Sequence, residues 1–238
     1  MIFKRTIVFI CILLLANVLK AQKQELRVLV LEQFKIDPSW TTTFDGGFYK
    51  GYNGADWTRW GIRNLTAYKL SGNVSVDVGF MYNRTATPDK VVQSEFRPHQ
   101  SIKFMYPRMA HMSFSHRFRM EEQFYTYNRD RENKNASRFR YEIKTKRAFN
   151  TNKNIEAKTP YWMASVEFFF NPVGKMEHDH ILFNRGRHGI GIGYKLNSKT
   201  SLEGTLFYQH THSNTNFSDY SDIAIFNVYI KNSLFSRK

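Results

Sequence analysis

The stretch Met112–Phe124 constrains the fold more than any other part of the chain. Its side chains alternate: one set is almost wholly apolar, and the other carries serine, glutamine and charges of both signs. A period of two predicts a β-strand. The strand is long, because strands of soluble domains usually have about 5–6 residues, whereas a tilted membrane-spanning strand needs roughly 9–11. A soluble sandwich would bury the apolar face, and a transmembrane barrel would turn it to lipid and the charges to its lumen.

The first 21 residues have the features of a secretory signal peptide. Lys4 and Arg5 form a charged start, and Ile7–Leu19 is apolar but shorter than the roughly 20 residues of a membrane helix. We therefore predict a signal peptide at residues 1–21 and a barrel domain at residues 22–238, the alternative being an uncleaved amphipathic anchor. The only cysteine, Cys11, falls in the first segment. The mature chain then has no thiol for a disulfide, a metal site or a nucleophile.

The charge balance limits the classes of partner. The chain has 35 Lys and Arg against 20 Asp and Glu, and three of the basic residues lie in the signal segment, so the mature net charge is about +12. Such a charge fits nucleic acid, an anionic membrane surface or an anionic solute. Export argues against nucleic acid. We expect outer-membrane lipid and lipopolysaccharide as surroundings, and small anions as solutes.

The alternation of Met112–Phe124 recurs along the whole mature chain. Eleven segments read as strands, with tight turns after every second strand and longer links between; the link near Asn150 is long where a short turn is due. Short turns on one side and longer loops on the other are typical of an outer-membrane barrel. Because bacterial barrels normally have an even number of strands, we expect ten or twelve. The strands are expected at residues 27–36, 41–50, 57–70, 74–83, 93–106, 112–124, 138–147, 161–170, 187–196, 201–209 and 223–235.

Aromatic residues lie near the ends of these segments, where the girdles of a transmembrane barrel sit. The sequence therefore predicts an all-β fold, an antiparallel up-and-down transmembrane β-barrel of about 10–12 strands in the cell outer membrane. The aromatic residues are Trp57, Trp60, Tyr82, Tyr106, Tyr125, Tyr161, Trp162, Tyr194 and Tyr208.

An ordered set of motifs resembles an uncharacterised family of Gram-negative outer-membrane β-barrels, catalogued as a domain of unknown function. The family usually has Arg where this chain has Gln123. The resemblance covers nearly the whole mature chain, and it implies a barrel and a location but supplies no function. The motifs are Arg59 with Tyr68-Lys69-Leu70, E-F-R-P-H-Q (Glu95, Arg97, Gln100), R-F-R-M-E-E (Arg117, Arg119, Glu121), R-F-R-Y (Arg138, Arg140, Tyr141), V-E-F-F-F-N (Glu167, Asn171) and F-N-R-G-R-H-G-I-G-I-G-Y (Asn184, Arg187, Gly191, Tyr194).

Charges on the inferred inner face form a ladder that neighbouring strands bring within reach of one another. One interpretation is a filled interior in which opposite charges pair and fix the strand register. The other is a cationic constriction that favours anions. Both need the same residues, so the sequence does not separate them. The ladder comprises Glu95, Arg97, Arg117, Arg119, Glu121, Arg138, Arg140, Glu142, Glu167, Arg187 and Glu203.

Two further groups of residues could form a functional site, although ordinary polar side chains without a function also explain them. His111 and Ser113 could serve a lipid acyl hydrolase as base and nucleophile, with Gln100 as a third group, although the strand pattern points the pair inward near the short turns. Two loops carry histidines that could meet a metal ion, His178 with His180 and His210 with His212. We predict no catalytic residue, no metal and no cofactor.

The sequence thus favours a monomeric, porin-like barrel without nucleic acid, either structural or a narrow cationic channel for small anions. The alternatives are an envelope-lipid acyl hydrolase barrel and a soluble secreted β protein that binds an anionic ligand.

Overall fold

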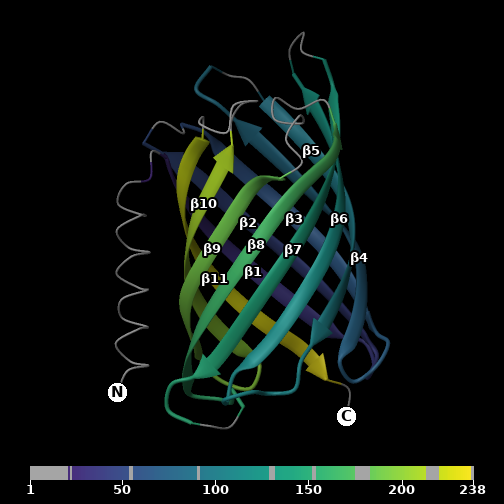
Figure 1. The fold of residues 1–238 in the computed structure, drawn as a ribbon, viewed down its shortest axis with the longest axis vertical. Coiled ribbons are helices and arrows are strands. Elements are labelled where there is room, and N and C mark those ends of the chain that lie inside the picture. The colour runs from purple at the N-terminus through teal and green to yellow at the C-terminus, as the bar shows by residue number, and fades with distance from the viewer. Residues whose placement is uncertain are drawn as a thin grey trace.

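The computed structural model of the chain describes residue 21 and residues 23–53, 56–89, 92–128, 132–151, 154–174, 183–212 and 220–236. Within these ranges eleven strands close into one barrel, and neighbours in the chain are neighbours in the wall (Figure 1). The predicted all-β barrel is confirmed, and the predicted signal peptide lies outside the described residues except for Ala21. The strands are β1 (Lys23–Lys35), β2 (Trp40–Tyr52), β3 (Thr58–Lys69), β4 (Val74–Ala86), β5 (Val92–Met105), β6 (Ser113–Tyr127), β7 (Lys134–Ala148), β8 (Thr159–Gly174), β9 (Phe183–Lys195), β10 (Thr200–His212) and β11 (Tyr220–Ser236).

The barrel closes with eleven strands, within the predicted range of about 10–12, and all eleven predicted segments form; only the expectation of an even number was wrong. An up-and-down meander with an odd count brings its first and last strands together in the same direction. β1 and β11 accordingly pair in parallel from Lys23 opposite Ile223 to Lys35 opposite Ser236. Every other neighbouring pair is antiparallel, from β1 with β2 through to β10 with β11. The parallel pairing of β1 with β11 leaves no free sheet edge. A barrel in a bilayer must have none, because lipid cannot hydrogen-bond an unpaired backbone.

The two rims of the barrel differ. We call the lower rim of Figure 1 the short-turn rim; there β1 joins β2 through residues 36–39, and β9 joins β10 through residues 196–199. The opposite one, where β2 ends and β3 begins, is the long-link rim. Each strand has 12 to 17 residues, enough for a tilted span of the hydrocarbon core.

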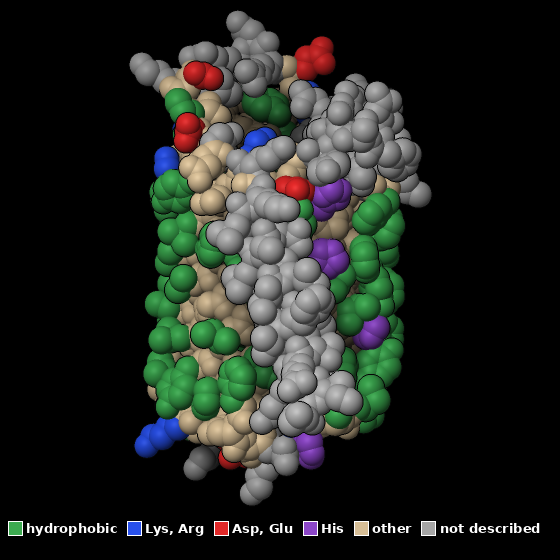
Figure 2. Space-filling view, turned by 60° about the vertical axis from the view of Figure 1, so that its left-hand side comes forward, with side chains coloured by type: hydrophobic (Ala, Val, Ile, Leu, Met, Phe, Trp, Pro, Cys, Tyr) green, Lys and Arg blue, Asp and Glu red, His purple; other side chains and the backbone are tan. Residues whose placement is uncertain are grey.

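The outer wall is apolar. Large side chains that alternate along the strands are exposed on it, among them Val28, Phe48, Ile62, Val78 and Ile192, the last with 66% of its surface accessible. Figure 2 shows hydrophobic side chains distributed over the described part of the visible wall between the rims. A soluble β protein would bury this face, so the soluble alternative is excluded and the fold is that of a transmembrane barrel. No helix in the described ranges is long and apolar enough to cross a membrane.

Strand β6 also turns its apolar side chains to the outer wall. Phe118 stacks on Tyr141 of β7 on the outer face, with ring centroids 4.6 Å apart. His116, the one polar member of the apolar set, also faces outward, and its Nδ1 lies 2.5 Å from the hydroxyl of Tyr141. This hydrogen bond satisfies a polar ring in an apolar belt.

The predicted aromatic girdles are partly wrong. Trp60, Tyr106 and Tyr194 are exposed on the outer wall. Trp57 instead lines the lumen, and the hydroxyl of Tyr161 donates to Glu203 inside the barrel at 2.8 Å. Tyr125 also has inward parity. Position near a strand end does not distinguish the two faces, because parity decides which way a side chain points.

Candidate functional site

The structure places all eleven residues of the charge ladder on the inner face, and each contacts an opposite charge within 4.0 Å. They pair across neighbouring strands, as Arg117 with Glu142 at 2.9 Å, and along one strand, as Arg97 with Glu95. Most of these contacts join into one network that runs from β5 to β9, and Glu203 stands apart from it.

Glu121 of β6 is the first centre of the network. Its side chain is 1% exposed, and four guanidinium groups surround its carboxylate. Arg138 and Arg140 of β7 donate hydrogen bonds to it, the latter at 2.6 Å. Arg97 and Arg119 approach at 3.7 and 3.9 Å. Three of the four guanidinium groups also contact a second carboxylate, so Glu121 is a node that links several ion pairs.

Glu167 of β8 is the second centre. It accepts hydrogen bonds from Arg140 at 2.6 Å and from Arg117 at 3.3 Å, and Arg187 lies 3.6 Å away. Arg140 thus bridges Glu121 and Glu167. A guanidinium that binds two carboxylates is held in a fixed orientation, because its donors form a rigid planar fork.

An aromatic ring orders the same arginines. Phe169 points into the lumen from β8 and is 1% exposed. The guanidinium carbons of four arginines lie 4.8–5.5 Å from the centre of its ring. The negative face of an aromatic ring attracts cations, so Phe169 gathers these groups without neutralising them. They belong to Arg138, Arg140, Arg185 and Arg187.

A cavity of about 380 Å³ lies in the lumen between mid-barrel and the long-link rim, and all eleven strands contribute to its lining. Nine arginines line it, while the carboxylates within 4.0 Å of these arginines number six among the described residues: Glu25, Asp45, Asp77, Glu95, Glu121 and Glu167. Three positive charges therefore remain uncompensated. We call this space the arginine cavity; its arginines are Arg27, Arg59, Arg63, Arg97, Arg119, Arg138, Arg140, Arg185 and Arg187.

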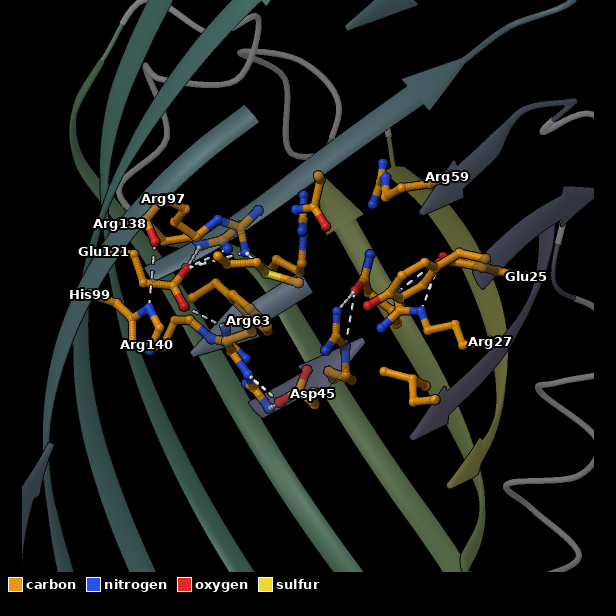
Figure 3. Close-up of a pocket in the computed structure, with 18 of the residues that line it drawn as sticks. Glu25, Arg27, Asp45, Arg59, Arg63, Arg97, His99, Glu121, Arg138 and Arg140 are labelled. Carbon is orange, nitrogen blue, oxygen red and sulfur yellow. Dashed lines mark hydrogen bonds and ion pairs between the residues drawn. The ribbon is translucent and has the colours of Figure 1, made fainter. Parts of the chain in front are cut away.

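The wall formed by β1–β3 carries isolated pairs in place of a network. Arg27 binds Glu25 two residues away on β1 at 2.7 Å, and Arg63 of β3 binds Asp45 of β2. Figure 3 shows Arg27 and Arg59 on the side of the cavity opposite Arg97, Arg138 and Glu121. This wall is therefore less strongly cross-linked than the wall from β5 to β9.

Arg59 has no carboxylate partner among the residues that the structure describes. Its Nε donates to the hydroxyl of Thr85 at 2.8 Å, and its guanidinium carbon lies 4.6 Å from the centre of the Trp57 ring. The side chain is thus held in place while its charge stays uncompensated.

The lumen toward the short-turn rim carries lysines, and we call it the lysine half. Glu203 of β10 accepts hydrogen bonds from Lys146 of β7 at 2.7 Å, from Lys231 of β11 and from Tyr161. Lys103 and Lys144 also have inward parity, and within the described residues neither has a carboxylate within 4.0 Å. Glycines on β9 make room here: a Cβ on Gly189 or Gly193 would lie 2.3 Å from the ring of Phe207 or Tyr161.

Several residues of this site are absent from the predicted ladder: Phe169, Arg27, Arg63, Arg185, Lys146 and Lys231. The charged ones share the inward parity of the residues that were named, so parity applied to every strand would have found them. Phe169 carries no comparable signal, because a phenylalanine of inward parity in a charged lumen looks like a misplaced apolar residue.

The structure does not bring the proposed hydrolase residues together. His111 was expected to share a strand face with Ser113, but it lies exposed in the tight turn before β6, where Ala110 and His111 adopt φ angles of 49° and 64°. The hydroxyl of Ser113 donates to the backbone carbonyl of Lys146 at 3.3 Å. Gln100 faces outward, with its Nε2 at 3.9 Å from the sulfur of Met120.

The histidine loops give no metal site in the part of the chain that is described. His178 and His180 fall outside it, and Nδ1 of His210 lies 2.8 Å from a carboxylate oxygen of Asp222. No three His, Cys, Asp or Glu side chains in the described ranges are grouped so as to hold a metal ion.

Comparison with known proteins gives a family but no activity. No curated protein matches the chain in sequence. A solved structure titled as the NanC porin is similar with 10% sequence identity and a TM-score of 0.48, covering 88% of this chain and 99% of that one. A family described as "Protein of unknown function (DUF2490)" matches residues 30–221. The chain therefore belongs to the DUF2490 family.

Proposed function

We propose that the chain forms a narrow outer-membrane channel whose cationic lumen admits small anions. The observation that carries the proposal is the uncompensated charge of the arginine cavity, with nine arginines against six nearby carboxylates. Arginine rings in a pore of low dielectric lower the energy of an anion and raise that of a cation. The lysine half continues the positive lining toward the other rim.

Placement in the outer membrane rests on the closed barrel and its exposed apolar wall. Closed barrels of this type are found in outer membranes, and the predicted signal peptide agrees with export. Lipid and lipopolysaccharide then surround the wall. A monomer is proposed, because the closed wall needs no second chain to pair its strand edges.

A structural role is the second candidate, and the network around Glu121 and Glu167 favours it. Eight side chains on four strands, β6 to β9, are tied together through these two carboxylates and Glu142. Paired charges of this kind can fill a lumen and fix strand register. A hydrolase has no observation in its favour, because His111, Ser113 and Gln100 lie apart.

Planar-bilayer recording tests the channel directly. The refolded protein is expected to give discrete conductance steps and an anion-selective reversal potential in a KCl gradient. The variant Arg27→Gln with Arg63→Gln lowers the cavity charge by two without touching the network of β5 to β9. We expect it to reduce the anion-to-cation permeability ratio about threefold or more.

A matched control removes two positive charges from the short-turn rim, with Lys69→Gln and Lys199→Gln, both of which are exposed. It is expected to leave the permeability ratio nearly unchanged, since exposed charges are screened by salt within about 10 Å. A protein that inserts but stays electrically silent would exclude the channel and leave the structural role.

A further inference from the structure

We infer that the arginine cavity is a binding site for a multivalent oxyanion, a solute that carries two or more carboxylate or phosphate groups. The inference deepens the proposed function and rests on it for the route by which such a solute crosses the barrel. It concerns recognition, whereas the proposed function concerns permeation of small anions in general.

The size of the charge deficit favours a multivalent solute. Three positive charges remain after every nearby carboxylate of the described residues is counted. A monovalent anion such as chloride compensates one of them. A solute with two or three negative groups compensates most of the deficit in one binding event, and no counter-ion then needs to enter with it.

The positions of two cavity arginines also favour a solute with separated anionic groups. Arg59 and Arg185 have no carboxylate within 4.0 Å among the described residues. Arg59 is near the start of β3 and Arg185 near the start of β9, so both lie toward the long-link rim. In the closed barrel β3 and β9 are five strands apart one way and six the other, which places the two arginines on opposite walls of the cavity. A solute with separated anionic groups can reach both.

The guanidinium groups of Arg59 and Arg185 are held in place beside aromatic rings, and buried donors among the cavity arginines lack an acceptor in the described part of the chain. Arg59 lies on Trp57, and the guanidinium carbon of Arg185 is 5.5 Å from the centre of the Phe169 ring. The buried Nε of Arg185 has no hydrogen-bond partner among the described residues. Neither has the Nε of Arg119, whose side chain is 4% exposed and whose nearest carboxylates are 3.9 and 4.0 Å away. Buried donors without acceptors are costly, so a bound oxyanion would satisfy them.

The cavity also has a suitable size. Small-molecule sites are usually about 300–1,000 Å³, and this one is about 380 Å³. Its rings face the arginines, so the lining offers fixed donors rather than an apolar surface. Such a lining recognises charge and its spacing.

The test is calorimetric titration of the refolded full chain in detergent, which does not require conduction. Citrate and pyrophosphate are the multivalent probes, and acetate and chloride are the monovalent ones. We expect citrate or pyrophosphate to bind at least about tenfold more tightly than acetate at the same ionic strength. The relative affinity of citrate and pyrophosphate shows whether carboxylates or phosphates are preferred.

The variants are Arg59→Gln and Arg185→Gln, singly and together, with Lys103→Gln plus Lys144→Gln as the matched control. The control also removes two lumen charges that lack a carboxylate partner in the described residues. We expect each arginine variant to weaken multivalent binding about tenfold and the control to change it less than about threefold. If the double arginine variant does not refold, the single variants and the charge-retaining Arg59→Lys and Arg185→Lys carry the test, because lysine loses the fork of donors.

The outcomes separate the two proposals. Equal effects of the arginine and lysine variants, or equal affinities for acetate and citrate, would overturn the site. An anion-selective pore that does not bind the multivalent probes would overturn the site and leave the channel. Tight, arginine-dependent binding by a protein that is silent in bilayers would support the site and exclude permeation.

Discussion

The two halves of the lumen carry positive charge in different ways. In the arginine cavity, each central carboxylate contacts several guanidinium groups, and Arg140 links Glu121 to Glu167. In the lysine half, Glu203 gathers Lys146, Lys231 and Tyr161, and no lysine there bridges two carboxylates in the described residues. Arginine forms rigid forks and stacks on aromatic rings, while lysine is a hydrated point charge on a flexible stem.

The two halves of the lumen therefore differ in how firmly their positive groups are held in one position. A guanidinium fixed by two carboxylates and by Phe169 presents its donors at a defined place, which suits recognition of a particular solute. An ammonium group on a flexible stem contributes to the electrostatic potential with little geometric demand. We therefore expect the arginine cavity to determine stability and recognition, and the lysine half to add mainly to the field.

The largest expected effect follows from removing the centre of the network. Glu121→Gln keeps the shape of the side chain but leaves four buried guanidinium groups without their shared carboxylate. We expect a loss of about 3–5 kcal/mol in the free energy of unfolding, the usual result of breaking a buried ion pair from one side. Urea-dependent folding into lipid vesicles, followed by the gel mobility of unheated protein, measures it.

The matched control is Glu142→Gln, because among the described residues this carboxylate forms an ion pair with Arg117 alone and both side chains are 21% exposed. We expect it to cost about 1 kcal/mol or less. Equal losses for the two variants would contradict the view of Glu121 as the centre of the network.

A smaller effect is expected from the aromatic ring. Phe169→Leu retains most of the apolar volume and removes the ring face beside four guanidinium groups. We expect it to lower the free energy of unfolding by about 1–3 kcal/mol and to weaken binding of multivalent anions.

Phe207→Leu is the control for the ring, because Phe207 faces the same lumen but, in the described part of the chain, has one guanidinium near its ring, that of Arg187 at 5.7 Å. The same vesicle assay is expected to show a loss roughly half as large or less. A larger loss at Phe207 would show that packing, not cation binding, determines the effect.

The smallest effect is expected in the lysine half. Lys103→Gln with Lys144→Gln removes two charges that have no ion-pair partner in the described residues, so little stability is lost, within about 1 kcal/mol. The anion-to-cation permeability ratio in bilayers is expected to fall by less than about twofold at 0.1 M salt and more at lower salt, since screening weakens. A fall as large as that of the Arg27 and Arg63 variant would show that both halves select equally.

Strict alternation made the fold predictable. In stretches such as Met112–Phe124 the alternation indicates which side chains face lipid. These stretches are also longer than the usual strands of a soluble sheet. The same alternation placed the ladder from Glu95 to Glu203 on the inner face. It did not distinguish Trp57 and Tyr161, which lie at strand ends but face inward, from Trp60 and Tyr106, which face out.

The closure of the barrel was not predictable from the strand pattern. Eleven segments were visible, yet the general preference for even numbers favoured ten or twelve. The parity of a strand indicates which way its side chains point. It does not indicate which strand pairs with the first or the last strand of the sheet. Only the register of β1 against β11 shows that the seam is parallel.

The sequence by itself thus determined the class of fold, the lipid-facing wall and the sign of the charge in the lumen, because each depends on local alternation and composition. Only the tertiary structure decided which side chains contact one another in the lumen. It placed four arginines around Phe169, gave Glu121 four cations, and left Arg59 and Arg185 uncompensated on opposite walls. Those contacts join side chains of neighbouring strands, and their distances depend on the register and curvature of the closed sheet.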